Sequence, residues 1–491
     1  MLRPWELNVT IVRESSMAIH VQIAQQIIIG IHNGRFTAGT ALPGSRDLAK
    51  KISVNRKTVI QAYDELVAQG WLVSEKNRGT FISSKAASIK PSLDSKTISL
   101  TFDSRSKEPI SIVSKQAHDH IHFNDGAPDN RLIPFEMMAR AMRHALISSS
   151  RHLQSNCNDV KGALTLRIAI LQMLNIERGL HANIDHICML RNSQMGLFVI
   201  AKTIVHANDF VVFEQLSNPL ARQAFVNCGA NILNVAHDDE GIDISNLKLL
   251  CVQYRIRAIY VTPQHQIPTA VIMSTGRREQ LLTLAERYNF LIIEDDTGHE
   301  YSFNNAINLP ISSSAKSKQL VYFGSLSTVL GTGLNISYMV ADKVIIDLCA
   351  KQINLIDPQS DRINEMAMTE LFKNGEISRH RSRTLKIYQE RRDYMIRLLH
   401  NELAEFASFN LPGSGLAIWL KINQSINMQK LLTDAEREKV SVMPANHYSS
   451  PNHQMSAIRL GYAHLNEDEM ALGINRLKTA FMNQQVDLLR A

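Results

Sequence analysis

Several features that would settle the class of this protein at once are missing from its 491 residues. No apolar run approaches the roughly 20 residues that span a bilayer, so no membrane partner is expected. The opening residues lack an unbroken apolar stretch after Arg3, which argues against a secretory signal. The five cysteines are scattered without a CxxC pair, which excludes a disulfide scaffold and a CxxC-type zinc site. We therefore expect a cytoplasmic protein without a metal site.

Charge is only mildly in excess, but it is unevenly distributed. The chain has 53 Lys and Arg against 46 Asp and Glu, a net charge of +7. Residues 1–84 hold ten of the basic and six of the acidic residues, so +4 of that charge lies in the first sixth of the chain. A small basic domain on a larger, nearly neutral one is typical of a nucleic-acid-binding head, with chance fluctuation as the alternative. The length itself predicts two or three domains.

The basic head predicts three helices followed by a β-hairpin. Isoleucines recur at every fourth residue in the first helix, over residues 18–33, and form an amphipathic stripe. Two further helices, over residues 46–52 and 56–69, are separated by a short polar break. Two strands, over residues 71–74 and 79–82, flank a polar tip. This order of elements predicts an α+β winged helix-turn-helix.

A winged helix-turn-helix places the start of its last helix in the major groove of DNA. Arg reads guanine and Asn reads adenine through paired hydrogen bonds, whereas Lys and Thr suit phosphates. The alternative is an ordinary solvated basic helix face. The candidate DNA-binding residues are Ser45, Arg46, Asn55, Arg56, Lys57, Thr58, Lys76 and Arg78.

The same head carries a resemblance to a known DNA-binding domain. The runs LPGSRDLA at 42–49, VNRKTV at 54–59 and GTF at 79–81 resemble the GntR-type domain, and the match extends over residues 15–83. This resemblance implies that Arg46, Arg56, Lys57 and Thr58 face DNA.

Beyond the head, composition and periodicity divide the chain further. Residues 85–120 are rich in Ser, Lys and Asp without a clear period, which predicts a linker. Residues 121–491 alternate apolar strands with helices, which predicts an α/β domain around a mainly parallel sheet. A smaller C-terminal α+β lobe is expected from about residue 375. We found no internal repeat.

Four segments of this large region carry polar residues in a familiar order. Asp295 follows a predicted strand, VTPQHQIPTA occupies 261–270, YFGSLSTVL occupies 322–330, and Arg459 lies in the run IRLGY. These segments resemble fold-type I, pyridoxal phosphate-dependent aminotransferases. In such enzymes an Asp holds the pyridine nitrogen, a Lys forms the Schiff base, and Ser and Arg hold the phosphate.

A GntR head joined to an aminotransferase-like domain is the plan of the MocR subfamily of bacterial transcription regulators. The run from Phe123 to Pro134 also matches the usual start of the large domain in that subfamily. The resemblance covers nearly the whole chain. It implies a head-to-tail homodimer in which each head packs near the large domain of its partner.

The chain departs from the enzyme pattern at four positions. Thr328 stands where the resemblance places the Schiff-base lysine, and Asn335 where it places a phosphate-binding Arg. Thr297 and Cys157 replace two expected tyrosines. Because Thr328 cannot form an imine, we expect no catalytic residue and no covalent cofactor. The remaining candidate ligand residues are Ser193, Gln194, Asp295, Ser325 and Arg459.

The leading hypothesis is a transcription regulator that binds double-stranded operator DNA as a homodimer. Its large domain would dimerise and sense pyridoxal phosphate or an amino or carboxylic acid without a covalent bond. One alternative is an aminotransferase with a vestigial head, against which Thr328 and Asn335 count. Another is a purely structural dimeric repressor with an empty pocket.

Overall fold

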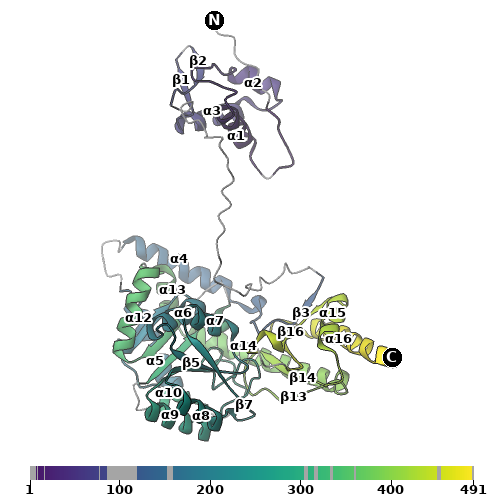
Figure 1. Cartoon of the computed structure of the whole chain (residues 1–491). Helices are drawn as coiled ribbons and strands as arrows, with labels where there is room; N and C mark the ends of the chain where they lie inside the picture. Colours follow the sequence, from purple (N-terminus) through teal and green to yellow (C-terminus); the bar gives the residue numbers. More distant parts are fainter. Residues whose placement is uncertain are drawn as a thin grey trace. The chain divides into compact units, whose positions relative to one another are not determined.

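The computed structural model divides the chain into two compact units, residues 1–112 and 113–491 (Figure 1). It describes residues 7, 9–15, 17–76, 78–85, 119–151, 159–303, 308–314, 319–331, 336–358, 361–450 and 455–488. Two of the candidate positions, Cys157 and Asn335, lie outside these residues. Within the described residues no helix is both long and apolar enough to cross a membrane.

The first unit is a winged helix-turn-helix, as the sequence predicts. Its elements are α1 (Ile19–His32), α2 (Ser45–Lys51), α3 (Arg56–Ala68), β1 (Leu72–Glu75) and β2 (Gly79–Ile82). The isoleucine stripe of α1 is the reason the helices pack, because Ile23 and Ile27 are fully buried against Leu48, Val59 and Leu66 of α2 and α3. β1 and β2 pair antiparallel and form the hairpin of the wing.

The second unit is built on a seven-stranded sheet in the order β4-β12-β11-β10-β9-β5-β6. The strands are β4 (Ile187–Leu190), β5 (Phe210–Glu214), β6 (Asn231–Val235), β9 (Ile256–Val261), β10 (Leu291–Asp295), β11 (Leu320–Ser325) and β12 (Ser337–Ala341). β12 runs antiparallel to both of its neighbours, and the other neighbouring pairs are parallel. The expected α/β fold with a mainly parallel sheet is thus confirmed.

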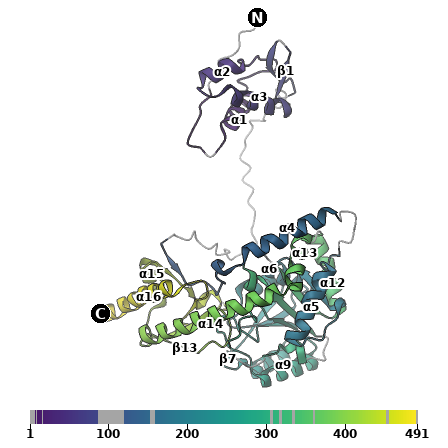
Figure 2. The same cartoon turned by 180° about the vertical axis from the view of Figure 1, so that it is seen from behind.

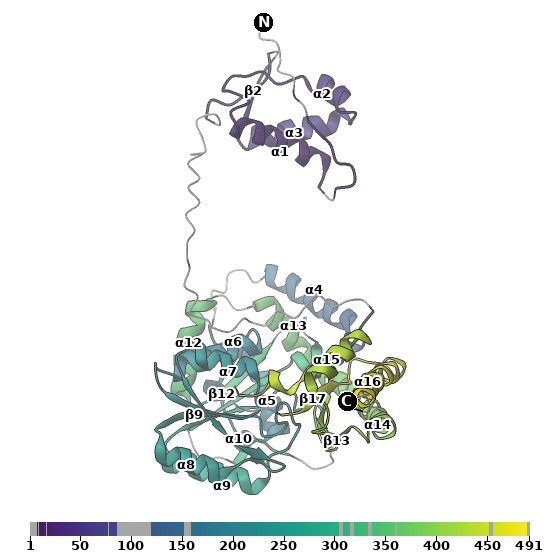
Figure 3. The same cartoon turned by 45° about the vertical axis from the view of Figure 1, so that its right-hand side comes forward.

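Helices cover both faces of this sheet (Figure 3). Val321 and Phe323 pack against the helices of one face, whereas Tyr322 between them packs against the other, because side chains alternate along a strand. One face is covered by α6 (Ser193–Ile204), α7 (Pro219–Asn227) and α12 (Lys343–Ile356). The other is covered by α4 (Phe135–Arg151), α5 (Leu164–Arg178), α8 (Ile244–Gln253), α9 (Thr275–Tyr288) and α13 (Arg362–Lys373).

The long helix α14 (Glu376–Glu402) leads into a smaller C-terminal lobe. Figure 2 shows this helix running alongside the lobe. Its four-stranded sheet has the order β13-β14-β17-β16. The beginning of the unit also packs here, because β3 (Ile121–His122) pairs with β15 (Val440–Ser441). The strands and helices of the lobe are β13 (Ala407–Phe409), β14 (Ala417–Ile422), β16 (Met443–Pro444), β17 (Ala457–Gly461), α15 (Met428–Arg437) and α16 (Glu467–Leu488).

Several short elements connect these layers. They are β7 (His237–Asp238), β8 (Gly241–Ile242), α10 (Ile311–Ser314), α11 (Ser327–Leu330), and 3-10 turns at Asn130–Leu132, Ile184–His186 and Ala445–His447. α11 directly follows β11, so it begins just beyond the candidate residue Ser325, which ends that strand.

Candidate functional site

The first candidate site is the start of α3 in the winged helix-turn-helix. The side chain of Asn55 accepts a hydrogen bond of 2.9 Å from the backbone N–H of Lys57 and so caps the helix. Arg56 and Lys57 are exposed, whereas Thr58 is half-buried. The Nε of Arg56 donates to the Oγ of Ser45 over 3.3 Å, which brings the starts of α2 and α3 together. These residues therefore form one basic surface.

The wing carries the other two candidate cations of the head. Lys76 and Arg78 are both exposed. The Nη1 of Arg78 lies 2.5 Å from the Oε2 of Glu75, and its guanidinium carbon lies 5.9 Å from the centre of the Phe81 ring. Because Arg78 is paired with Glu75, Lys76 is the cation of the wing that this ion pair does not engage.

The second candidate site lies at the ends of the strands in the large sheet. Asp295 ends β10 and is buried. Its carboxylate accepts hydrogen bonds of 2.6 Å from the hydroxyl of Tyr260 and 3.0 Å from the backbone N–H of Thr297. Burial raises the pKa of Asp295 above its usual value, and the two donors oppose that rise.

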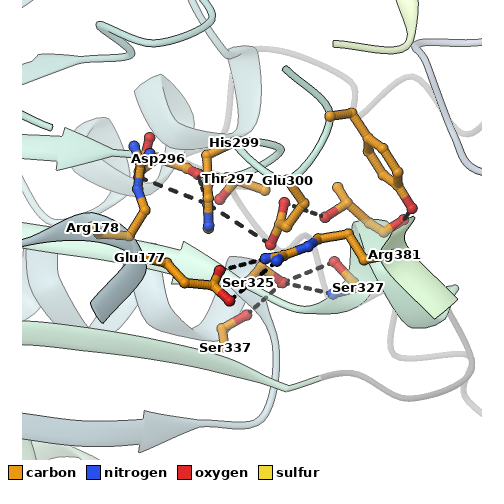
Figure 4. A network of polar contacts seen from close by, with 12 residues as sticks. Glu177, Arg178, Asp296, Thr297, His299, Glu300, Ser325, Ser327, Ser337 and Arg381 are labelled. Carbon is orange, nitrogen blue, oxygen red and sulfur yellow. Dashed lines mark hydrogen bonds and ion pairs between the residues drawn. The ribbon is translucent and has the colours of Figure 1, made fainter. Parts of the chain in front are cut away.

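Thr328 lies in α11, and its side-chain hydroxyl is already engaged in a hydrogen bond. Its hydroxyl donates to the Oε2 of Glu300 over 3.1 Å, and its carbonyl accepts from the hydroxyl of Tyr301 over 3.2 Å. Glu300 is buried. Glu300 was not among the predicted residues; it lies five residues beyond Asp295 and is brought here by the turn after β10 (Figure 4).

A run of serine hydroxyls connects β11, β12 and the first turn of α6. The Oγ of Ser325 lies 2.8 Å from that of Ser327 and accepts from that of Ser337 over 3.0 Å. The Oγ of Ser337 lies 3.3 Å from that of Ser193, the first residue of α6 (Figure 4 shows the three serines at 325, 327 and 337). Gln194 is exposed. We call Ser193, Ser325, Ser327 and Ser337 the serine cluster.

The serine cluster offers neutral donors at a helix N-terminus, where backbone N–H groups favour an anion. Two of its members, Ser327 and Ser337, were not among the predicted residues. Ser327 is adjacent to Thr328 in the same motif, so the sequence could have identified it as a candidate residue. Ser337 lies on an antiparallel strand, and nothing local in the sequence connects it with Ser325.

Arg459 lies on β17 and is buried. It is an ion-pair partner of Asp125, with 2.6 Å between its Nε and the Oδ1 of Asp125. Its Nη1 donates to the carbonyl of Pro268, and its Nη2 lies 3.4 Å from the Nε2 of His265. Burial and the nearby Arg459 lower the pKa of His265 to about 3, so that imidazole is neutral at pH 7.

A buried ionic network supports the turn that carries Thr297 and Glu300 (Figure 4). The Nη2 of Arg178 lies 2.8 Å from the Oδ2 of Asp296, which also accepts from the hydroxyl of Tyr322 over 2.7 Å. Because Asp296 is next to Asp295, this network fixes the backbone from which the carboxylate of Asp295 projects.

Comparison with known families matches both units. The model for bacterial regulatory proteins of the gntR family matches residues 19–82, and that for aminotransferase class I and II matches residues 119–477. The uncharacterized HTH-type transcriptional regulator YdeL of Bacillus subtilis is 26% identical over 96% of this chain and 98% of its own. The probable rhizopine catabolism regulatory protein MocR of Rhizobium meliloti is 25% identical over 96% of this chain and 95% of its own.

Solved structures share the fold of the second unit. Kynurenine aminotransferase of Pyrococcus horikoshii superposes with a TM-score of 0.70 at 24% identity, covering 74% of this chain and 91% of that one. The α-aminoadipate aminotransferase LysN of Thermus thermophilus gives a TM-score of 0.69 at 24% identity, covering 75% of this chain and 94% of that one.

Proposed function

Since the chain belongs to the aminotransferase class I and II family and carries a gntR-family winged helix-turn-helix, we infer that it is a DNA-binding transcription regulator. The observation that carries this inference is the complete head, from α1 to the wing, joined to the aminotransferase-like unit in one chain. The relatives named as regulatory proteins match the chain along nearly its whole length, which supports the same inference. The layout is that of the MocR subfamily.

The basic surface at the starts of α2 and α3 is the proposed DNA contact. Arg46, Arg56 and Lys57 are exposed there, and Asn55 holds the first turn of α3 in place. Asn55 accepts the capping bond through its oxygen, so its amide N–H groups are the part that we assign to DNA. Lys76 and Arg78 would contact phosphates beside this surface.

This function can be tested without knowing the operator. The full-length protein would be used to select bound duplexes from a random pool, and the enriched sequences would be read. We expect a two-fold symmetric motif, because a dimer reads two half-sites. Recovery of sequences no different from the starting pool would contradict sequence-specific binding.

The second unit is proposed to dimerise and to sense a small molecule in the cytoplasm. Exposed apolar side chains on α4 and α5 support an interface, with Phe135 59%, Leu146 52% and Leu164 53% exposed. Sedimentation of the purified protein tests this proposal, since a monomer at micromolar concentration would contradict it.

The candidate residues fit some chemical groups of pyridoxal phosphate and do not fit others. Asp295, buried at the end of β10, suits a pyridine nitrogen. The serine cluster, which reaches the N-terminus of α6 through Ser193, suits a phosphate. Thr328 does not suit the aldehyde, because it has no amine and its hydroxyl is bonded to Glu300. The residues therefore fit a non-covalent ligand and do not fit imine chemistry.

We accordingly assign no enzymatic step to this pocket, and the alternative of an aminotransferase is not favoured. Titration of the purified protein with pyridoxal phosphate, followed by calorimetry and by absorbance, tests the sensor proposal. Saturable heat without an imine absorbance band is the expected result. An imine band in the native protein would contradict the assignment of Thr328.

A further inference from the structure

The hydroxyl of Thr328 presents an acceptor, and no donor, to a ligand. Its one proton is donated to the Oε2 of Glu300 over 3.1 Å, so that only lone pairs of its oxygen remain. Thr328 is half-buried, whereas Glu300 behind it is buried. At the position that the resemblance assigns to a lysine amine, this chain therefore places an acceptor next to a carboxylate.

The carboxylate of Glu300 has no cation committed to it among the described residues. Glu300 is 8% exposed, and its Oε1 accepts no hydrogen bond from them. The Nδ1 of His299 lies 3.8 Å from that oxygen, but it donates its proton to the backbone carbonyl of Asp296 over 2.9 Å. Arg381, drawn beside Glu300 in Figure 4, is paired with both carboxylate oxygens of Glu177. A buried carboxylate in this setting favours a positive charge placed nearby.

An amine, a hydroxyl and an aldehyde differ in how they meet such an acceptor. A protonated amine has only donors, whereas an aldehyde oxygen has only lone pairs. An aldehyde that faced the Thr328 oxygen would bring two acceptors together. An amine would donate to that oxygen and bring a positive charge toward Glu300, where little water weakens the attraction. A hydroxyl lies between the two, because it can donate but has no charge.

The rest of the ligand is defined by two parts of the pocket already described. Asp295 suits a pyridine nitrogen, and the serine cluster suits a phosphate. We propose that Glu300, acting through Thr328, makes this pocket selective for the aminomethyl form of the phosphorylated pyridine, pyridoxamine phosphate, over its aldehyde form. This inference rests on the proposed function of the pocket as a sensor. Glu300 is then a positioning residue, which orients the Thr328 hydroxyl and supplies the charge that distinguishes an amine.

Pyridoxamine phosphate and pyridoxine phosphate are suitable probes, because an amine in one is a hydroxyl in the other and neither reacts with surface lysines. Titration calorimetry of the full-length protein at constant ionic strength measures both affinities. We expect the amine to bind about tenfold more tightly, since hydrogen bonds are stronger when one partner is charged. Pyridoxal phosphate should bind no more tightly than pyridoxine phosphate.

Glu300→Gln keeps the size of the side chain and removes its charge. The preference for the amine should fall to about twofold or less in this variant, because the charge that strengthens the interaction is gone. Its affinity for pyridoxine phosphate should stay the same, whereas a purely structural defect would weaken both probes alike. Glu402→Gln, which removes a carboxylate paired with Lys478, is the matched control and should keep the full preference. A thermal unfolding scan would show that each variant folds.

Equal affinities of the native protein for the two probes overturn this proposal and leave the pocket as a sensor without the selectivity. A preference for the amine that Glu300→Gln retains in full overturns it as well. Binding of neither probe overturns both this inference and the sensor proposal on which it rests. None of these titrations uses DNA, so their failure is distinguishable from a failure of the regulator assignment.

Discussion

Thr328 donates its hydroxyl proton to the carboxylate of Glu300 over 3.1 Å. A hydroxyl thus occupies the position that the resemblance assigns to a Schiff-base lysine, and its hydrogen bond ends on a buried acid. The same carboxylate would be a favourable neighbour for an ammonium group at residue 328, because opposite charges attract strongly where little water is present.

Thr328→Lys restores an amine at the position that the resemblance assigns to the Schiff base and is expected to gain covalent attachment of pyridoxal phosphate. After borohydride reduction, mass spectrometry should find the cofactor on residue 328 in this variant and no adduct in the native protein. Thr328→Met is the matched control, since it provides similar length without an amine. An adduct on the native protein would show that another lysine serves the pocket.

Arg56→Ala should weaken binding to a selected duplex by about 1–3 kcal/mol and relax preference at one base pair, if Arg56 reads a guanine. Fluorescence anisotropy with selected and scrambled duplexes measures both effects. Lys57→Ala should instead weaken binding to both duplexes alike and reduce the salt dependence by about one charge. Lys248→Ala, an exposed change on α8, is the control and should alter neither.

Glu214 provides a prediction for the pH dependence of stability. It is fully buried, and burial raises the pKa of its carboxyl from 4.5 to about 8. The folded state therefore keeps a proton that the unfolded state loses, so this group lowers the free energy of unfolding as pH rises from about 4.5 to 8. Glu214→Gln should flatten the decline in that window and be more stable than the native protein at pH 8. Urea unfolding at several pH values measures this, and an unchanged slope would contradict it.

The Arg178–Asp296 pair should behave as a buried ion pair. Arg178→Met or Asp296→Asn alone leaves the other partner without its counter-ion and should cost about 3–5 kcal/mol. The double variant should lose less than the two losses added together, because it leaves neither charge unpaired. Urea unfolding of the four proteins measures the coupling, and strictly additive losses would show that the pair is not energetically linked.

The sequence predicted those parts of the molecule that depend on local pattern. The isoleucine stripe of α1 and the apolar runs of β5, β9, β10 and β11 determined the two folds, because helices and strands bury one side at a fixed period. Motif spacing likewise located Asp295 and Ser325 at the ends of neighbouring strands and Thr328 three residues beyond the second.

Contacts between residues that are far apart in the sequence could not be predicted from local pattern. Asp125 and Arg459 are 334 residues apart in number, and no periodicity relates them. Ser337 joins the serine cluster only because β12 runs antiparallel beside β11, and Glu300 reaches Thr328 through the turn after β10. The roles of the DNA-facing residues stay predictions, and so do those of all the candidate ligand residues of the large unit.

Each hydroxyl of the serine cluster has one proton, and this limits how the cluster can be ordered. Ser337 donates toward Ser325, so its own oxygen is left to accept from Ser193. An anion at the start of α6 would draw the proton of Ser193 toward itself and remove that donor from Ser337. Binding of an anion at this end would thus change which hydrogen bonds the serine hydroxyls donate, without movement of the backbone.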